Sequence, residues 1–117
     1  MLNFLFRRSI ASSSVTMAAV KDLVEQLIHD NAVQVFSKSY CPYCTKAKSL
    51  LDSMNIKYNA VELDLIGEQG QQIQDYLYQK TQQRTVPNIF IREQHVGGCD
   101  DLHSAKASGK LESLLKL

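Results

Sequence analysis

From residue 18 onward, the spacing of apolar and polar residues predicts an alternation of helices and strands. Over residues 20–28 the apolar side chains recur at the spacing of a helix with one buried face, and this helix is expected to close at residues 30–31. Val33–Ser37 is short and rich in β-branched and aromatic residues, which predicts a buried strand. A second helical stripe over residues 47–54 is expected to end near Asn55.

The second half of the chain predicts shorter elements. Apolar and polar residues alternate over residues 56–60, which indicates a strand. Glycines predict a loop at residues 67–70, followed by a helix that carries Ile73 and Leu77. Two strands joined by a turn are then predicted at Asn88–Ile91 and at residues 95–96. One or two closing helices are expected in the leucine-containing segment 102–117.

The order of these elements predicts the fold class. A strand, a helix and a second strand in succession imply a right-handed crossover between parallel strands. The last two strands are close enough in sequence to form an antiparallel hairpin. We therefore expect an α/β fold with a small four-stranded mixed sheet and helices on both faces.

Composition and charge exclude several classes of partner. The 117 residues suffice for one domain. The 13 basic and 12 acidic side chains nearly cancel, so no strong field favours nucleic acid or an acidic membrane surface. No apolar run approaches the roughly 20 residues that span a bilayer. We expect a globular protein that binds neither nucleic acid nor membrane.

The first 16 residues differ in composition from the rest. They contain Arg7, Arg8 and several hydroxyl residues, and the first acidic residue is Asp22. This composition is typical of a mitochondrial transit peptide, although an unprocessed tail is the alternative. Met17 offers a second start that would give an untargeted form. We therefore expect an extension over residues 1–16, a folded domain over residues 17–117, and a location in the mitochondrion, the cytoplasm or both.

Three cysteines, Cys41, Cys44 and Cys99, carry the candidate chemistry. A small secreted scaffold usually has more cysteines in an even number, so a structural disulfide framework is not indicated. Pro42 marks a helix start, because proline is favoured in the first helical turn. Cys41 then lies at or beside the N-cap, where unpaired amides and the helix dipole favour the thiolate. Lys38 is positioned to add a positive charge.

Cys44 is expected to differ from Cys41. It lies one turn further along the same helix, in line with Ala47 and Leu51 on the buried side. A buried thiol without help from the helix dipole stays protonated and is less reactive. This asymmetry predicts that Cys41 attacks a substrate disulfide and that Cys44 later attacks the mixed disulfide at Cys41.

Two other interpretations of the cysteines remain open. The C-x2-C spacing is also found in zinc sites, and His95, Cys99 and His103 recur every four residues as possible further ligands. Against zinc, Pro42 favours a helix start over the looped knuckle that holds two thiolates on the metal. Inert buried thiols are the other interpretation. We expect no metal site.

Four pieces of sequence, in order and at compatible spacing, together resemble the dithiol glutaredoxins. They are Lys38, the C-P-Y-C segment 41–44, the R-T-V-P segment 84–87 and the G-G-C-D-D segment 97–101. The resemblance runs from about residue 18 to the end of the chain. It implies a thioredoxin-like fold, which agrees with the element order, and a cis peptide bond between Val86 and Pro87. Ordinary thioredoxins fit less well, because their motif contains Trp and C-G-P-C.

The resemblance also implies glutathione as the reducing co-substrate, with no tightly bound cofactor. Lys38 and Gln74 match the family positions that hold the glycine carboxylate, and Tyr43 would pack against the bound tripeptide. The residues implied to contact glutathione are Lys38, Tyr43, Gln74, Thr85, Val86, Pro87, Asp100 and Asp101.

The other implied roles concern the later motifs. Val86 would pair with the cysteinyl backbone of glutathione through its own N–H and C=O groups. The backbone amides at Asp100 would bind the γ-glutamyl carboxylate, and the Asp101 carboxylate would accept from the amino group. Taken singly, these residues have simpler interpretations: Lys38 and Gln74 as solvated surface, the two aspartates as N-caps, and Pro87 as a loop proline.

The implied activity is a glutathione-dependent reduction of protein–glutathione mixed disulfides and small disulfides. A deglutathionylating enzyme of this kind is expected to act as a monomer on glutathionylated or disulfide-containing proteins. The alternative is a carrier that holds a 2Fe–2S cluster between two subunits with glutathione as extra ligand. Proline at position 42, where such carriers usually have Gly or Ser, argues against it. Cys99 is expected to have no catalytic role, although glutathionylation or an intermolecular disulfide there stays open.

Overall fold

The computed structural model describes residues 16–116. Their elements follow the predicted order, with one additional 3₁₀ turn. The helices and strands are α1 (Met17–Asp30), β2 (Val33–Ser37), α2 (Pro42–Ser53), β3 (Asn59–Glu62), η1 (Leu63–Leu65), α3 (Glu68–Thr81), β4 (Asn88–Ile91), β5 (Gln94–Gly97), α4 (Cys99–Ser108) and α5 (Lys110–Leu115).

The strands form one four-stranded sheet in the order β3-β2-β4-β5. β2 pairs parallel with β3, as the strand–helix–strand opening predicts, and antiparallel with β4. β4 and β5 form the predicted antiparallel hairpin. The predicted mixed sheet is therefore confirmed.

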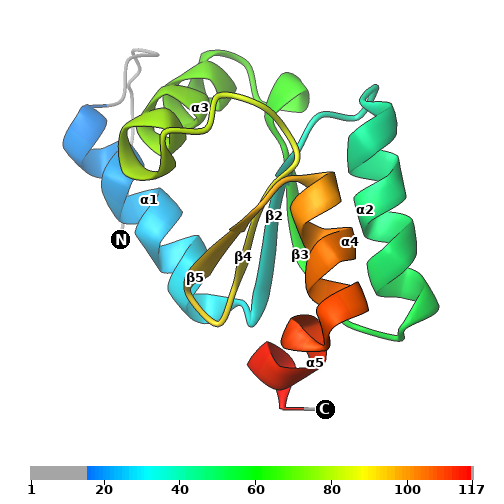
Figure 1. The fold of residues 1–117 in the computed structure, drawn as a ribbon. Helices are drawn as coiled ribbons and strands as arrows, with labels where there is room; N and C mark the ends of the chain where they lie inside the picture. Colours follow the sequence, from blue (N-terminus) through cyan, green and yellow to red (C-terminus); the bar gives the residue numbers. More distant parts are fainter. Residues whose placement is uncertain (1–15, 117) are drawn as a thin grey trace.

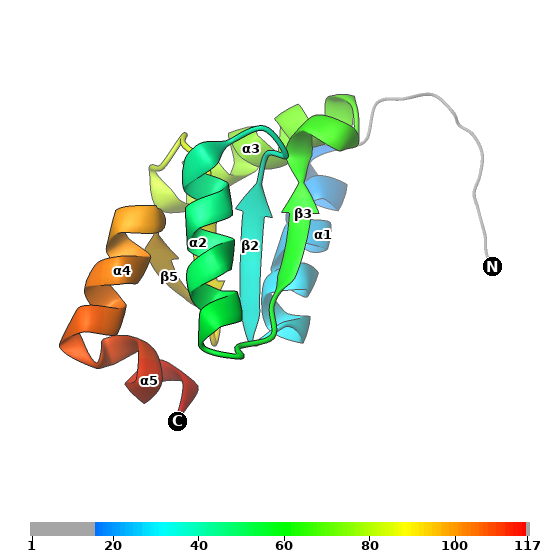
Figure 2. The ribbon, with the colours of Figure 1, turned by 90° about the vertical axis from the view of Figure 1, so that its right-hand side faces the viewer.

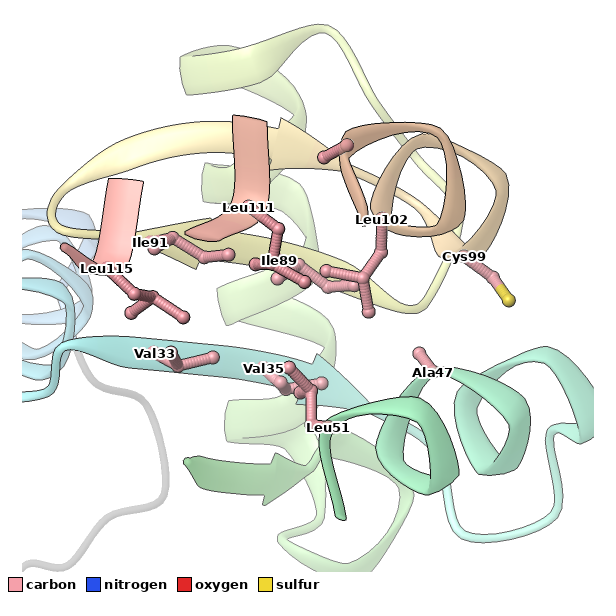
Figure 3. Close-up of a cluster of buried hydrophobic side chains, with 11 residues drawn as sticks. Val33, Val35, Ala47, Leu51, Ile89, Ile91, Cys99, Leu102, Leu111 and Leu115 are labelled. Atoms are coloured by element: carbon pink, nitrogen blue, oxygen red, sulfur yellow. The ribbon is translucent and has the colours of Figure 1, made fainter. Parts of the chain in front are cut away.

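Helices cover both faces of this sheet. Figure 1 shows α1 and α3 on one side and α2 and α4 on the other. Successive residues of β2 face opposite layers: Val35 packs in the cluster beneath α2 and α4, whereas Phe36 packs beneath α1 and α3. Figure 3 shows the first cluster, where Leu51 of α2 and Leu102 of α4 approach the sheet. Because both layers fix the strands, they also fix the strand ends that carry the site.

Two predicted boundaries were wrong. The strand predicted over residues 56–60 begins at Asn59, because Ile56 donates its N–H to Leu51 O (3.0 Å) and closes the end of α2 instead of pairing in the sheet. Ile56 and Tyr58 nevertheless pack on the core cluster, which explains the alternating pattern. The loop predicted at residues 67–70 is also shorter, since α3 begins at Glu68.

The glycines at that start have separate functions. Gly67 is the N-cap of α3 with a φ of 65°, a left-handed conformation that favours glycine. Gly70 lies within the helix, where an added Cβ would meet Leu63 O at 1.9 Å. The second glycine therefore reflects close packing of α3 on η1, not a loop.

The chain start lies largely outside the described residues. Residues 1–15 hold nearly all of the predicted targeting extension, and they are not among those that the structure describes. Thr16 begins the described part and caps α1, because its side-chain oxygen accepts from Ala19 N–H at 3.1 Å. Within residues 16–116, no helix is both long and apolar enough to cross a membrane.

Candidate active site

Cys41 occupies the N-cap of α2, where the sequence places it. Pro42 follows as the first helical residue, and the Cys44 N–H donates to Cys41 Sγ at 3.3 Å. The sulfur therefore replaces the side-chain oxygen that usually caps a helix. A backbone donor and the positive end of the helix dipole both stabilise negative charge on this sulfur.

Cys44 lies on the buried face of α2, as predicted. Its side chain is fully buried, like those of Ala47 and Leu51, which follow along the same face. Burial raises the pKa of the Cys44 thiol, and the neighbouring Cys41 raises it further. Both cysteines are free thiols in this structure. The two sulfurs therefore have different environments: one caps a helix at the surface and the other is buried and protonated.

The segment before β4 brings a backbone carbonyl to Cys41. The Val86–Pro87 peptide bond is cis, as the family resemblance implies. Val86 O lies 3.7 Å from Cys41 Sγ. Gln83, which the sequence did not single out, supports this segment because its side-chain amide donates to Thr85 O (3.0 Å) and Pro87 O (2.9 Å). A polar residue in a loop gives no sequence signal for such a role.

A groove of about 440 Å³ lies between this segment and the start of α4. Six of the eight residues predicted to contact glutathione line it. Its lining residues are Tyr43, Gln83, Thr85, Val86, Pro87, Gly98, Cys99, Asp100 and Asp101. The groove therefore joins the two later sequence motifs at one surface.

The start of α4 closes the far side of the groove. Gly98 is the N-cap, and its N–H donates to Asp101 Oδ2 at 2.9 Å. Asp101 is therefore not the N-cap of α4, as its simpler interpretation had it, but the third helical residue, whose carboxylate caps the helix from within the first turn. Asp100 and Asp101 are both exposed. The first-turn amides of such a helix have no partner within the helix and favour an anion.

Lys38 and Gln74 lie apart from that groove, in a smaller one of about 200 Å³. Gln74 donates its side-chain amide to Arg84 O at 2.7 Å, which ties α3 to the segment that lines the larger groove. Asp64 holds the loop after Lys38, because it accepts from both the N–H (2.8 Å) and the hydroxyl of Ser39. These hydrogen bonds from Ser39 keep the pKa of Asp64 below its usual range. Nothing in the local sequence around Ser39 or Asp64 indicates this contact.

The residues of the zinc alternative do not converge. Cys99 contacts His103 on its own helix (Sγ–Nδ1 3.6 Å), whereas His95 contacts Asn88 (Nε2–Oδ1 2.9 Å). Burial raises the pKa of the Cys99 thiol, and the nearby Asp100 raises it further. In residues 16–116, no group of three or more His, Cys, Asp or Glu side chains is placed to hold a metal ion.

Comparisons with known proteins agree with this geometry. The family model for glutaredoxin matches residues 33–96. Glutaredoxin-1 of Rhizophagus irregularis is 56% identical over 99 residues, covering 85% of this chain and 97% of that protein. Human mitochondrial glutaredoxin-2 is 48% identical over 92 residues, covering 79% of this chain and 56% of that protein.

Solved structures show the same fold. The crystal structure of a buckwheat glutaredoxin–glutathione complex has a TM-score of 0.82 and 41% identity, covering 86% of this chain and 90% of that one. The crystal structure of the holo form of poplar glutaredoxin C1 has a TM-score of 0.78 and 39% identity, covering 85% of this chain and 96% of that one. The chain therefore belongs to the glutaredoxin family and is a glutathione-dependent disulfide oxidoreductase with a thioredoxin-like fold.

Proposed function

We propose that this protein reduces protein–glutathione mixed disulfides and small disulfides, with Cys41 as the nucleophile. The observation that carries the proposal is the position of Cys41 Sγ, which caps α2 and lies 3.7 Å from Val86 O beside the larger groove. A thiolate there is stabilised for attack, and a substrate in the groove would lie next to it.

Glutathione would bind across the two grooves. Val86 would pair with its cysteinyl backbone. Supporting this role, the Val86 N–H makes no hydrogen bond with any other residue in 16–116. The glycine carboxylate would lie at Lys38 and Gln74. A buckwheat relative has been crystallised with glutathione, which supports a glutathione site in this fold.

The γ-glutamyl end would lie at the start of α4. Its carboxylate would accept from the first-turn amides at Asp100, and its amino group would donate to Asp101. Tyr43, which is 58% exposed, is free to pack over the tripeptide. Thr85 and Pro87 would form the floor beside Val86.

In the first reaction the Cys41 thiolate attacks the glutathionyl sulfur. The protein thiolate leaves and takes up a proton, and glutathione stays bound to Cys41 through a new disulfide. A second glutathione, as thiolate, then attacks the glutathionyl sulfur of that disulfide. Oxidised glutathione leaves, and the Cys41 thiolate is restored.

Protein disulfides would use Cys44 in addition. After Cys41 forms a mixed disulfide with the substrate, Cys44 attacks Cys41 Sγ and expels the substrate thiolate. The resulting Cys41–Cys44 disulfide is then reduced by two molecules of glutathione. The single N–H···S contact of 3.3 Å between the two residues places them within one helical turn, which makes this bond reachable.

The two cysteine variants test the assignment. We expect Cys41→Ser to abolish reduction of both a glutathionylated protein and a protein disulfide. Cys44→Ser, the matched control, should retain the first activity and lose the second. Equal loss of the first activity in both variants would contradict the proposal. A brown, dimeric purified protein would instead support the 2Fe–2S carrier.

We also propose that residues 1–16 direct the chain to the mitochondrion and that translation from Met17 gives a cytoplasmic form. Three relatives with mitochondrial names and the acid-free, Arg-containing composition support this. Fusing residues 1–16 to a fluorescent protein tests it. Diffuse fluorescence throughout the cell would contradict the targeting role.

A further inference from the structure

A single side-chain amide bonds the two backbone carbonyls that flank Val86. Gln83 Nε2 lies 3.0 Å from Thr85 O and 2.9 Å from Pro87 O. Because both oxygens converge on one nitrogen, this nitrogen fixes the peptide units before and after Val86 relative to each other. Val86 O itself lies beside Cys41 Sγ, at 3.7 Å.

The bond to Thr85 O also sets the direction of the Val86 N–H. The two groups belong to one planar peptide unit, and this unit is trans, so its C=O and N–H point in opposite directions. A donor that holds the carbonyl on one side therefore directs the N–H to the other side. This N–H is the group that would donate to the cysteinyl carbonyl of glutathione.

Gln83 is itself held at the end of α3. Its backbone N–H donates to Thr81 Oγ1 at 3.1 Å, and the Thr81 hydroxyl donates to Leu77 O, one turn back in the helix, at 2.7 Å. The side chain of Gln83 is half-buried and lines the larger groove. Figure 2 shows the segment between α3 and β4 in yellow-green beside the start of α4, which lines the same groove. Gln83 thus connects a rigid helix end to the segment that faces the substrate.

The carbonyl before this segment is held in the same way. Arg84 O accepts from the side-chain amide of Gln74 at 2.7 Å. The two glutamines together bond the carbonyls of residues 84, 85 and 87. Val86 is therefore the residue of this segment whose N–H and C=O are presented for pairing with a substrate.

We propose that Gln83 is a positioning residue for substrate recognition: it holds Thr85 O and Pro87 O so that the peptide groups of Val86 meet the cysteinyl residue of glutathione. Gln83 takes no part in the exchange of disulfide bonds. It acts on the rate only through the backbone groups of the substrate's cysteine. The inference rests on the proposed pairing of Val86 with glutathione.

Gln83→Met tests the proposal, because methionine has nearly the length of glutamine but no N–H donor and no charge. Gln82→Met is the matched control. Gln82 is the preceding residue, is exposed, and donates its side-chain amide to carbonyls at the end of α3 instead. Both changes are made in the full chain with Cys44→Ser as the parent, so that one exchange at Cys41 is followed.

Three mixed disulfides of thionitrobenzoate serve as substrates. Their other halves are glutathione, N-acetylcysteine N-methylamide and mercaptoethanol. The second keeps the cysteinyl peptide groups but lacks both ends of glutathione, and the third has no peptide group. In each, the Cys41 thiolate attacks the sulfur of the variable half and forms a new disulfide with it. The original S–S bond breaks, and thionitrobenzoate leaves as a coloured thiolate whose release gives the rate.

We expect Gln83→Met to slow the glutathione and N-acetylcysteine N-methylamide substrates by the same factor, about fivefold to tenfold, which corresponds to the loss of roughly one oriented hydrogen bond. The mercaptoethanol substrate should react at the parent rate, because it has no peptide group to pair with Val86. Its rate also shows that Cys41 and the fold are intact in the variant. Gln82→Met should match the parent on all three substrates.

The other outcomes separate the alternatives. Equal slowing of all three substrates would indicate a general structural effect and would overturn the inference. Slowing of the glutathione substrate alone would place the effect at an end of the tripeptide and would overturn it too, as would parent rates throughout. A parent that reacts no faster with the glutathione substrate than with the mercaptoethanol substrate would contradict the proposed glutathione site, and the inference with it.

Discussion

Gly70→Ala places two physical effects in opposition. Alanine in a helix interior is favoured over glycine by about 1 kcal/mol, so helix propensity alone predicts a more stable protein. The structure predicts the reverse, because the new Cβ would lie 1.9 Å from Leu63 O, whereas ordinary contacts begin near 3.4 Å. The atom it meets is backbone, and it cannot rotate away.

The size of the effect follows from that overlap. Overpacking of a well-packed site costs about 1–3 kcal/mol. A clash this close, with a backbone carbonyl, is at the upper end of that range, so the net loss is about 2 kcal/mol after the helix gain. For a domain of this size, that corresponds to a fall in Tm of about 10 °C. Moving η1 would also displace Asp64, which holds the loop at Ser39, so activity should fall with stability.

Thermal and urea unfolding followed by circular dichroism measure the change. Gln79→Ala is the control, because Gln79 is exposed on the same helix. It should leave the free energy of unfolding within about 0.5 kcal/mol of the wild type. A Gly70→Ala variant as stable as the wild type would refute the close packing of α3 on η1.

Two further predictions follow from single contacts. Asp64 is exposed and accepts two hydrogen bonds from Ser39, which lies near Cys41. Asp64→Ala should therefore reduce turnover with a glutathionylated substrate, with a smaller relative effect on Tm. Unchanged turnover would count against the restraint of this loop by Asp64. Burial and the hydrogen bond to Glu25 raise the pKa of Tyr76 to about 12. In an ultraviolet titration this tyrosine should ionise last, and stability should decline as pH rises from about 10, the unfolded value, through the folded value. Simultaneous titration of all tyrosines near the unfolded value would contradict this.

Local sequence patterns were sufficient for features set by neighbours in the chain. Pro42 predicts the start of α2 and therefore the position of Cys41 at its N-cap, and the helical spacing of Cys44 with Ala47 and Leu51 predicts the burial of Cys44. The strand Val33–Ser37 was predicted to the residue, because a short β-branched run between a helix end and a proline-marked helix start has few alternatives. The family motifs then indicated which distant segments form the site.

Contacts between distant residues could not be predicted in this way. Ser39 and Asp64 are 25 positions apart, and nothing in either local sequence indicates their hydrogen bonds. Gln83 supports the cis-proline segment through its side-chain amide, although the polar sequence around it suggests only an exposed loop. The Lys48–Glu62 ion pair likewise depends on how α2 lies on β3. The prediction of a loop at Gly70 was wrong for the same reason, because glycine occurs both at close helix contacts and in flexible loops.

The central claim is that Cys41, whose sulfur caps the start of α2, is the reactive thiol of the pair. Alkylation of Cys41 by iodoacetamide, measured against pH in a Cys44→Ser background and located by peptide mass, tests it most directly. An ordinary thiol, with a pKa of about 8.5, reacts very slowly at about pH 6. We expect Cys41 to react there much faster than the same cysteine in urea-unfolded protein. Equal rates in the folded and unfolded chains would contradict the account.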